Sequence, residues 1–165
     1  MIILGIDPGL ATMGYGVVES VKGNVSVVDY GVVTTPKDLT LPQRLRRIEE
    51  GVTALIEKFR PENIAIEELF FSKNITNGIM VAEARGVILL TADKLVGEEV
   101  YEYTPNQIKQ AITGYGGADK MQMQLMVQAL LRLKKVPRPD DAADALAVAL
   151  CHAHTSRLST QFKVR

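Results

Sequence analysis

Four carboxylates that lie far apart in the sequence are the residues best suited to chemistry. Asp7 and Glu67 each end a short apolar run, whereas Asp141 and Asp144 lie three residues apart in the Ala/Leu-rich segment DAADALA. Carboxylates repel one another, so a fold that gathers them has to place positive charge between them. Oxygen ligands of this kind favour hard divalent cations. If the fold brings the four acids together, they predict metal-assisted phosphoryl chemistry.

Three of these acids, and two lysines that could bind phosphate, also have a purely structural interpretation. Asp7 precedes a Pro-Gly pair and is therefore suited to capping a turn. Asp141 and Asp144 can complement the positive end of a helix dipole without any catalytic role. Lys109 and Lys120 flank a glycine-rich loop, where they either contact phosphate groups or are simply solvated. The residues alone leave these alternatives open.

The hydrophobic pattern predicts the elements that must position the acids. Apolar and alternating runs predict strands over residues 2–7, 14–22, 25–35, 63–67 and 100–104. Three- and four-residue periodicity predicts helices over residues 41–60, 79–96, from 105 onward, 119–135, and after an N-cap at Asp140. The strand–helix–strand order between residues 2 and 67 favours parallel pairing of its two strands. The prediction is an α/β fold, with a mixed five-stranded sheet flanked by helices.

The composition is that of one globular domain of 165 residues, 47% of them hydrophobic and 23% charged. We expect no membrane segment, and the single Cys151 in an apolar run predicts an inert thiol in a reducing cytoplasm. The net charge is zero, but residues 1–104 carry 10 Lys/Arg against 15 Asp/Glu, and residues 105–165 carry 9 against 4. This asymmetry fits either an acidic catalytic half beside a phosphate-binding half, or two solvated surfaces of opposite sign.

Five segments of the chain, taken in order, resemble the RuvC family of bacterial Holliday-junction resolvases. They are ILGIDPG at residues 3–9, AIEELF at 65–70, ARGV at 84–87, QIKQ at 107–110 and DAADALA at 141–147. The likeness runs from Met1 to about His154. It implies a ribonuclease H-like nuclease domain over residues 1–155, followed by a polar tail over residues 156–165 that we expect to be disordered.

The resemblance also implies roles for individual residues. The family has four catalytic acids that bind two Mg²⁺ ions roughly 4 Å apart, with Mn²⁺ as an alternative, and these acids match Asp7, Glu67, Asp141 and Asp144. Some members carry histidine at the third of these positions. The family's DNA-contacting lysines match Lys109 and Lys120. Phe70 matches an aromatic residue associated with opening or stacking bases at the junction centre.

The implied activity is endonucleolytic cleavage during recombination and repair. Such an enzyme nicks two strands of like polarity symmetrically at a four-way DNA junction and leaves 5′-phosphate and 3′-hydroxyl ends. The implied partners are the junction, a second copy of the chain and the RuvA–RuvB branch-migration complex. The helix predicted over residues 79–96 supports a homodimer independently, because its apolar residues cover more than one face. We expect Ile88 and Leu90 to point outward from it.

Two other classes of protein share part of this pattern. ATPases of the actin and sugar-kinase superfamily also start with a strand that ends in Ile-Asp-x-Gly, but they close two domains around the nucleotide. This chain has the length of one domain and contains no Walker motif. A non-catalytic nucleic-acid or protein-interaction module is the second class, and the presence of all four acids argues against it.

Overall fold

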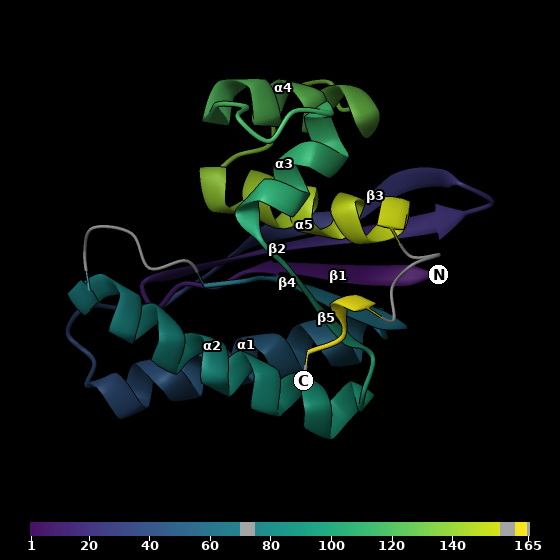
Figure 1. The fold of residues 1–165 in the computed structure, drawn as a ribbon. Coiled ribbons are helices and arrows are strands. Elements are labelled where there is room, and N and C mark those ends of the chain that lie inside the picture. The colour runs from purple at the N-terminus through teal and green to yellow at the C-terminus, as the bar shows by residue number, and fades with distance from the viewer. Residues whose placement is uncertain (70–74, 156–160, 165) are drawn as a thin grey trace.

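The computed structural model of the chain has three layers, with a central sheet between two layers of helices (Figure 1). It describes residues 1–69, 75–155 and 161–164, and only the backbone of residues 75–77. Buried apolar side chains lie on both faces of the sheet and form two hydrophobic cores, one under each helical layer. Within these described ranges, no helix is long and apolar enough to cross a bilayer.

The sheet consists of β1 (Ile2–Asp7), β2 (Thr12–Val21), β3 (Asn24–Thr34), β4 (Asn63–Glu67) and β5 (Val100–Tyr103). The spatial order is β3-β2-β1-β4-β5. β2 pairs antiparallel with both β1 and β3, whereas β4 pairs parallel with both β1 and β5. The predicted mixed five-stranded sheet is therefore confirmed.

Helices cover both faces of this sheet (Figure 1). One layer contains α1 (Leu41–Phe59) and α2 (Ile75–Val96), and the other contains α3 (Pro105–Thr113), α4 (Lys120–Leu130) and α5 (Asp140–Thr155). α5 lies directly on the sheet, and α3 and α4 pack against α5. α5 is therefore the element through which the outer helices are placed relative to the strands.

Three predicted details of the helices are wrong. α2 begins at Ile75 rather than at residue 79, and α4 ends at Leu130 rather than at residue 135. α4 stops because Arg132 adopts a φ of 52°, in the left-handed region that ends helices. Ile88 does not point outward but is fully buried in the core beneath α2, whereas Leu90 is 56% exposed, as expected.

The described part of the tail lies against the edge of the sheet. Lys163 forms an antiparallel bridge with Tyr101 of β5 and an ion pair of 2.9 Å with Glu99. The ring centroid of Phe162 lies 4.9 Å from that of Tyr103. Strand pairing and ring contact thus hold residues 161–164 against β5, and the rest of the predicted tail lies outside the described residues.

Glycines in β1 and β2 let α5 approach the sheet until the backbones touch. A Cβ atom added to Gly5 would lie 2.3 Å from the carbonyl oxygen of Ala145, and one added to Gly14 would lie 2.0 Å from that of Asp141. An added Cβ at Gly16 would lie 2.8 Å from the helix backbone. No side chain larger than hydrogen fits at such distances. These three glycines therefore determine how close α5 lies to the sheet.

Replacing Gly14 by Ala tests this constraint. The added methyl group would collide with the backbone of Asp141, so α5 has to shift away from β2. We expect the free energy of unfolding to fall by about 1–3 kcal/mol, the usual cost of overpacking, as measured by urea denaturation. Gly86→Ala in α2 is the matched control, because a Cβ there meets no atom within 4 Å and alanine favours a helix. A Gly14→Ala protein as stable as wild type would contradict the proposed constraint.

Candidate active site

Asp7 and Glu67 lie at the carboxyl ends of two neighbouring parallel strands. β1 and β4 pair in register up to Ile6 and Ile66, so the next residue of each strand reaches the same edge of the sheet. Side chains alternate along a strand, and the residues two positions earlier lie on the α5 side of the sheet. Asp7 and Glu67 therefore face α5, and their side chains share a hydrogen bond.

α5 adds two more acids from its first turns. Asp141 and Asp144 lie about one helical turn apart in α5. The backbone of Asp141 packs against Gly14 of β2, so this end of the helix lies close to the sheet. Burial, followed by the charges of Glu67, Asp144 and Asp141, raises the pKa of Asp7 to about 8. Burial also raises the pKa values of Glu67 and Asp144. The structure thus brings all four predicted acids within electrostatic reach of one another.

The charges of this site fit divalent cations. Burial and the neighbouring carboxylates raise the pKa of Asp7, and the oxygens of these acids are the ligands that Mg²⁺ and Mn²⁺ prefer. As the side chains are oriented, no three His, Cys, Asp or Glu residues in the described part of the chain form a ready-made metal cluster. The Nζ atom of Lys120 lies 3.3 Å from a carboxylate oxygen of Asp144. This ammonium group balances part of the negative charge that a metal ion would otherwise balance.

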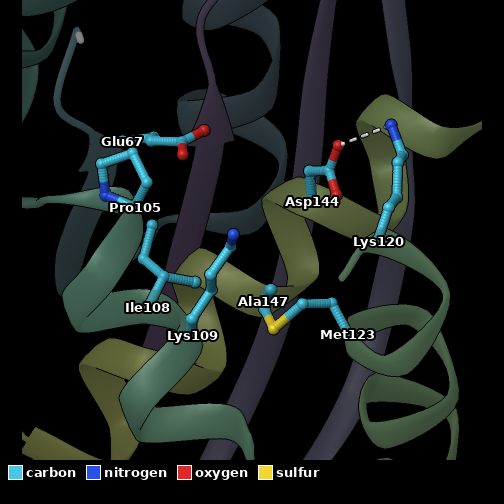
Figure 2. A pocket seen from close by; sticks show the side chains of 8 residues that line it. All are labelled: Glu67, Pro105, Ile108, Lys109, Lys120, Met123, Asp144 and Ala147. Atoms are coloured by element: carbon cyan, nitrogen blue, oxygen red, sulfur yellow. Dashed lines mark ion pairs between the residues drawn. The ribbon is translucent and has the colours of Figure 1, made fainter. Parts of the chain in front are cut away.

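A cavity of about 210 Å³ opens beside Glu67 and Asp144 (Figure 2). Its walls come from β4, α3, α4 and α5, and its lining residues are Glu67, Pro105, Ile108, Lys109, Lys120, Met123, Asp144 and Ala147. Figure 2 shows the side chain of Lys109 reaching into the region between the two carboxylates, whereas Lys120 approaches Asp144 from the side away from Glu67. The cavity therefore combines oxygen ligands for a cation with ammonium groups for a phosphate.

Capped helix starts position the two lysines. The side chain of Thr104 accepts a hydrogen bond of 3.2 Å from the amide of Gln107, which fixes the start of α3 one turn before Lys109. The carboxylate of Asp119 accepts a hydrogen bond of 2.8 Å from the amide of Gln122 at the start of α4. Lys120 is the first residue of α4, so this cap sets where its side chain begins.

The role of Asp140 differs from the predicted one. This residue is not an N-cap but the first residue of α5, and its carboxylate pairs with Lys120 at 3.3 Å and with Arg138. The buried side chain of Gln124 donates a hydrogen bond of 3.0 Å to the same carboxylate. Asp140 and Asp144 therefore hold Lys120 between them. The adjacent acids in the sequence indicate a charged helix start. The sequence does not reveal that α4 packs nearby and supplies Lys120 and Gln124 as partners of Asp140.

Four further residues that could take part in chemistry do not join the four acids or lie outside the described residues. Glu68 follows Glu67 in the chain but is exposed, because successive side chains of a strand point to opposite faces. His152 is buried and forms a hydrogen bond of 2.7 Å with the hydroxyl of Tyr103, so it does not join the site. Burial raises the pKa of the Cys151 thiol to about 12, in agreement with an inert cysteine. Phe70 lies outside the described residues.

The chain is similar to known proteins over nearly its whole length. The family model for crossover junction endodeoxyribonuclease RuvC matches residues 3–152. Relatives of that name from Rubrobacter xylanophilus and Alkaliphilus oremlandii are 56% and 50% identical, over 96% and 100% of this chain and 88% and 100% of their own lengths. T. thermophilus RuvC, solved in complex with Holliday junction substrate, is 38% identical with a TM-score of 0.92, and 99% of both chains is covered.

The solved relative agrees with the observed fold. The solved RuvC structure confirms the α/β fold that the sequence predicted, with its mixed five-stranded sheet and flanking helices. The matched residues 3–152 contain the four acids and both cavity lysines. The chain belongs to the RuvC family of crossover junction endodeoxyribonucleases.

Proposed function

We propose that this nuclease resolves four-way DNA junctions by nicking two strands of like polarity symmetrically, in a reaction that depends on divalent metal ions. The observation that carries the proposal is the convergence of four carboxylates from β1, β4 and α5 beside a cavity with two lysines. The family supports the choice of substrate, since the T. thermophilus relative was solved with a Holliday junction. The role of such cleavage would be in recombination and repair.

The chain's own residues divide the chemical work between them. Asp7, Glu67 and Asp144 would hold two Mg²⁺ ions, and Asp141 would either be a further ligand or orient the attacking water. When bound, such ions act as Lewis acids toward the phosphoryl group and lower the pKa of water. The two cavity lysines would bind the DNA backbone and so place the scissile phosphate next to the acids. Cleavage in this arrangement would leave a 5′-phosphate and a 3′-hydroxyl.

A homodimer built partly on α2 belongs to the same proposal. Four large apolar side chains of α2 are between 43% and 56% exposed, namely Ile79, Met80, Leu90 and Leu95. An exposed apolar surface of this kind favours a partner, and a copy of the same helix would bury it symmetrically. Two active sites related by a two-fold axis would suit the two-fold symmetry of a four-way junction.

Two finer predictions rest on the family resemblance, namely the stacking of junction bases by Phe70 and cooperation with a RuvA–RuvB branch-migration complex. A third, activity in the cytoplasm, rests on the free, buried thiol of Cys151. The main rival, a non-catalytic module that only binds junctions, makes the opposite prediction in a cleavage assay.

Glu67→Gln and Asp7→Asn are expected to abolish nicking of an immobile four-way junction in Mg²⁺. Both variants should bind the junction as tightly as wild type or more tightly, because phosphate affinity comes from basic residues. Nicking and gel-shift affinity are measured on the same preparations. Glu68→Gln, which removes the exposed neighbouring acid, is the matched control and should cut normally.

Two outcomes would contradict this assignment. A loss of junction affinity by more than about tenfold, or about 1.4 kcal/mol, would place the two acids in folding or docking. A wild-type protein that binds the junction but leaves it intact in Mg²⁺ and in Mn²⁺ would favour the non-catalytic module.

The metal-free protein should lose stability as the pH rises. The pKa of Asp7 is about 8 in the folded protein, against an ordinary value of 3.8. Between these two pH values the folded state therefore keeps a proton on Asp7 that the unfolded state has released. Its contribution is therefore complete below about pH 4 and is lost as the pH rises through 8. Urea denaturation in EDTA at pH 6 and pH 8.5 should show this fall, and Asp7→Asn should reduce it. If the free energy of unfolding falls equally with pH in wild type and Asp7→Asn, the raised pKa of Asp7 is contradicted.

Leu90→Glu should convert the proposed dimer into monomers. Leu90 is 56% exposed on α2, so a charge there should disrupt a partner surface without disturbing the core. Sedimentation at micromolar concentration gives the mass, and a junction assay shows whether the two nicks are still coordinated. Leu125→Glu on α4 is the matched control, since Leu125 is 52% exposed in the other helical layer. A wild-type monomer at this concentration would rule out the dimer.

A further inference from the structure

We propose that Arg44 and Lys37 form a second phosphate-binding subsite, on the side of the carboxylates opposite Lys109 and Lys120. This inference rests on the proposed function, because its ligand is a backbone phosphate of the cleaved DNA strand. It assigns a role to two residues that belong neither to the four acids nor to the cavity lysines. Three observations carry it: an open hollow, the way in which Arg44 is held, and the position of the hollow relative to Asp141.

The hollow has a volume of about 640 Å³ and borders the carboxylate site. The loop between β1 and β2, the segment after β3, and the N-terminal parts of α1 and α2 surround it together with the start of α5. Its lining residues are Gly9, Leu10, Ala11, Thr12, Lys37, Arg44, Met80, Val81 and Asp141. The two basic residues among them are the ones that a phosphate would contact.

Arg44 is held in this hollow by a buried hydroxyl group. Its Nε donates a hydrogen bond of 2.8 Å to Oγ1 of Thr35. Thr35 is only 5% exposed and donates in turn a hydrogen bond of 2.5 Å to the carbonyl oxygen of Leu10. A buried threonine thus holds one edge of the Arg44 guanidinium in place. Such positioning reduces the side-chain entropy that binding a ligand would cost.

The remaining donors of Arg44 are available to a ligand. Within the residues that the structure describes, the bond from Nε to Thr35 is the one polar contact of the Arg44 side chain, and its two terminal nitrogens form no hydrogen bond and no ion pair. A guanidinium presents paired N–H groups that match two oxygens of a phosphate. Lys37 is exposed on the same rim and adds a second cation. Arginine held at Nε and open at its other nitrogens is therefore suited to bidentate phosphate contact.

Asp141 and Asp144 place the two hollows on either side of the acids. Asp144 lines the cavity that contains Lys109 and Lys120, whereas Asp141, one helical turn earlier, lines the hollow that contains Arg44. A DNA strand with its scissile phosphate at the acids has further phosphates on both sides of it. The cavity lysines would bind the phosphates on one side, and Arg44 with Lys37 would bind those on the other. The strand would then cross the acids in a fixed direction.

Salt dependence of junction binding tests the subsite without relying on cleavage. Each lost phosphate contact lowers the slope of log affinity against log salt by about 0.9. We expect Arg44→Gln and Lys37→Ala each to lower the slope by up to this amount, in EDTA so that no cutting occurs. Arg46→Gln is the matched control, because Arg46 is an exposed arginine of the same helix that does not line the hollow. Thr35→Val should weaken binding less than Arg44→Gln does, since it removes only the group that orients Arg44.

The outcomes separate this proposal from the proposed function. Slopes unchanged in both Arg44→Gln and Lys37→Ala, while Lys109→Ala lowers the slope, would overturn the subsite and leave junction binding intact. A slope unchanged in Lys109→Ala as well would count against the proposed DNA-binding face as a whole. Equal losses in Arg44→Gln and Arg46→Gln would show a general effect of charge and would also overturn the subsite. If Arg44→Gln lowers the melting temperature, the exposed Lys37→Ala decides between these outcomes.

Discussion

The close contact of α5 with β1 and β2 is the constraint on which the rest of the structure depends. Glycines at positions 5, 14 and 16 remove the side chains that would otherwise separate the helix from the sheet. The carbonyl of Asp141 therefore lies where a side chain at Gly14 would be. This contact brings both acids of α5 to the strand ends that carry Asp7 and Glu67. It also places α3 and α4, and with them both cavity lysines, because these helices pack on α5.

Bringing the acids together has an electrostatic cost, and the chain meets it in two ways. Burial and the charges of the neighbouring acids raise the pKa of Asp7 and so favour its protonated, uncharged form. Lys120 forms ion pairs with both Asp140 and Asp144 and offsets part of the negative charge on the α5 side. A divalent cation at the acids would favour the deprotonated form of Asp7 and would compete with Lys120 for Asp144. Protonation of Asp7 and the ion pairs of Lys120 thus reduce the repulsion between the acids when no cation is bound.

Much of the fold and of the acid set could be predicted from the sequence, because the signals are local. Asp7 and Glu67 end short buried strands, and alternation along each strand decides which face they share. Features that depend on distant contacts could not be predicted. Ile88 lies on a helix that is apolar on several sides, so the periodicity does not tell which side is buried. The pairing of Tyr101 with Lys163 joins segments about 60 residues apart and depends on tertiary contact alone.

Locating bound ions in the structure shows whether the four carboxylates form one cation site. Crystals grown with Mn²⁺ would give anomalous scattering peaks at the bound metal. We expect peaks whose ligands are carboxylate oxygens of Asp7 and Glu67, together with at least one acid of α5. Manganese bound elsewhere, with Asp7 still hydrogen-bonded to Glu67 and no ion beside them, would contradict it.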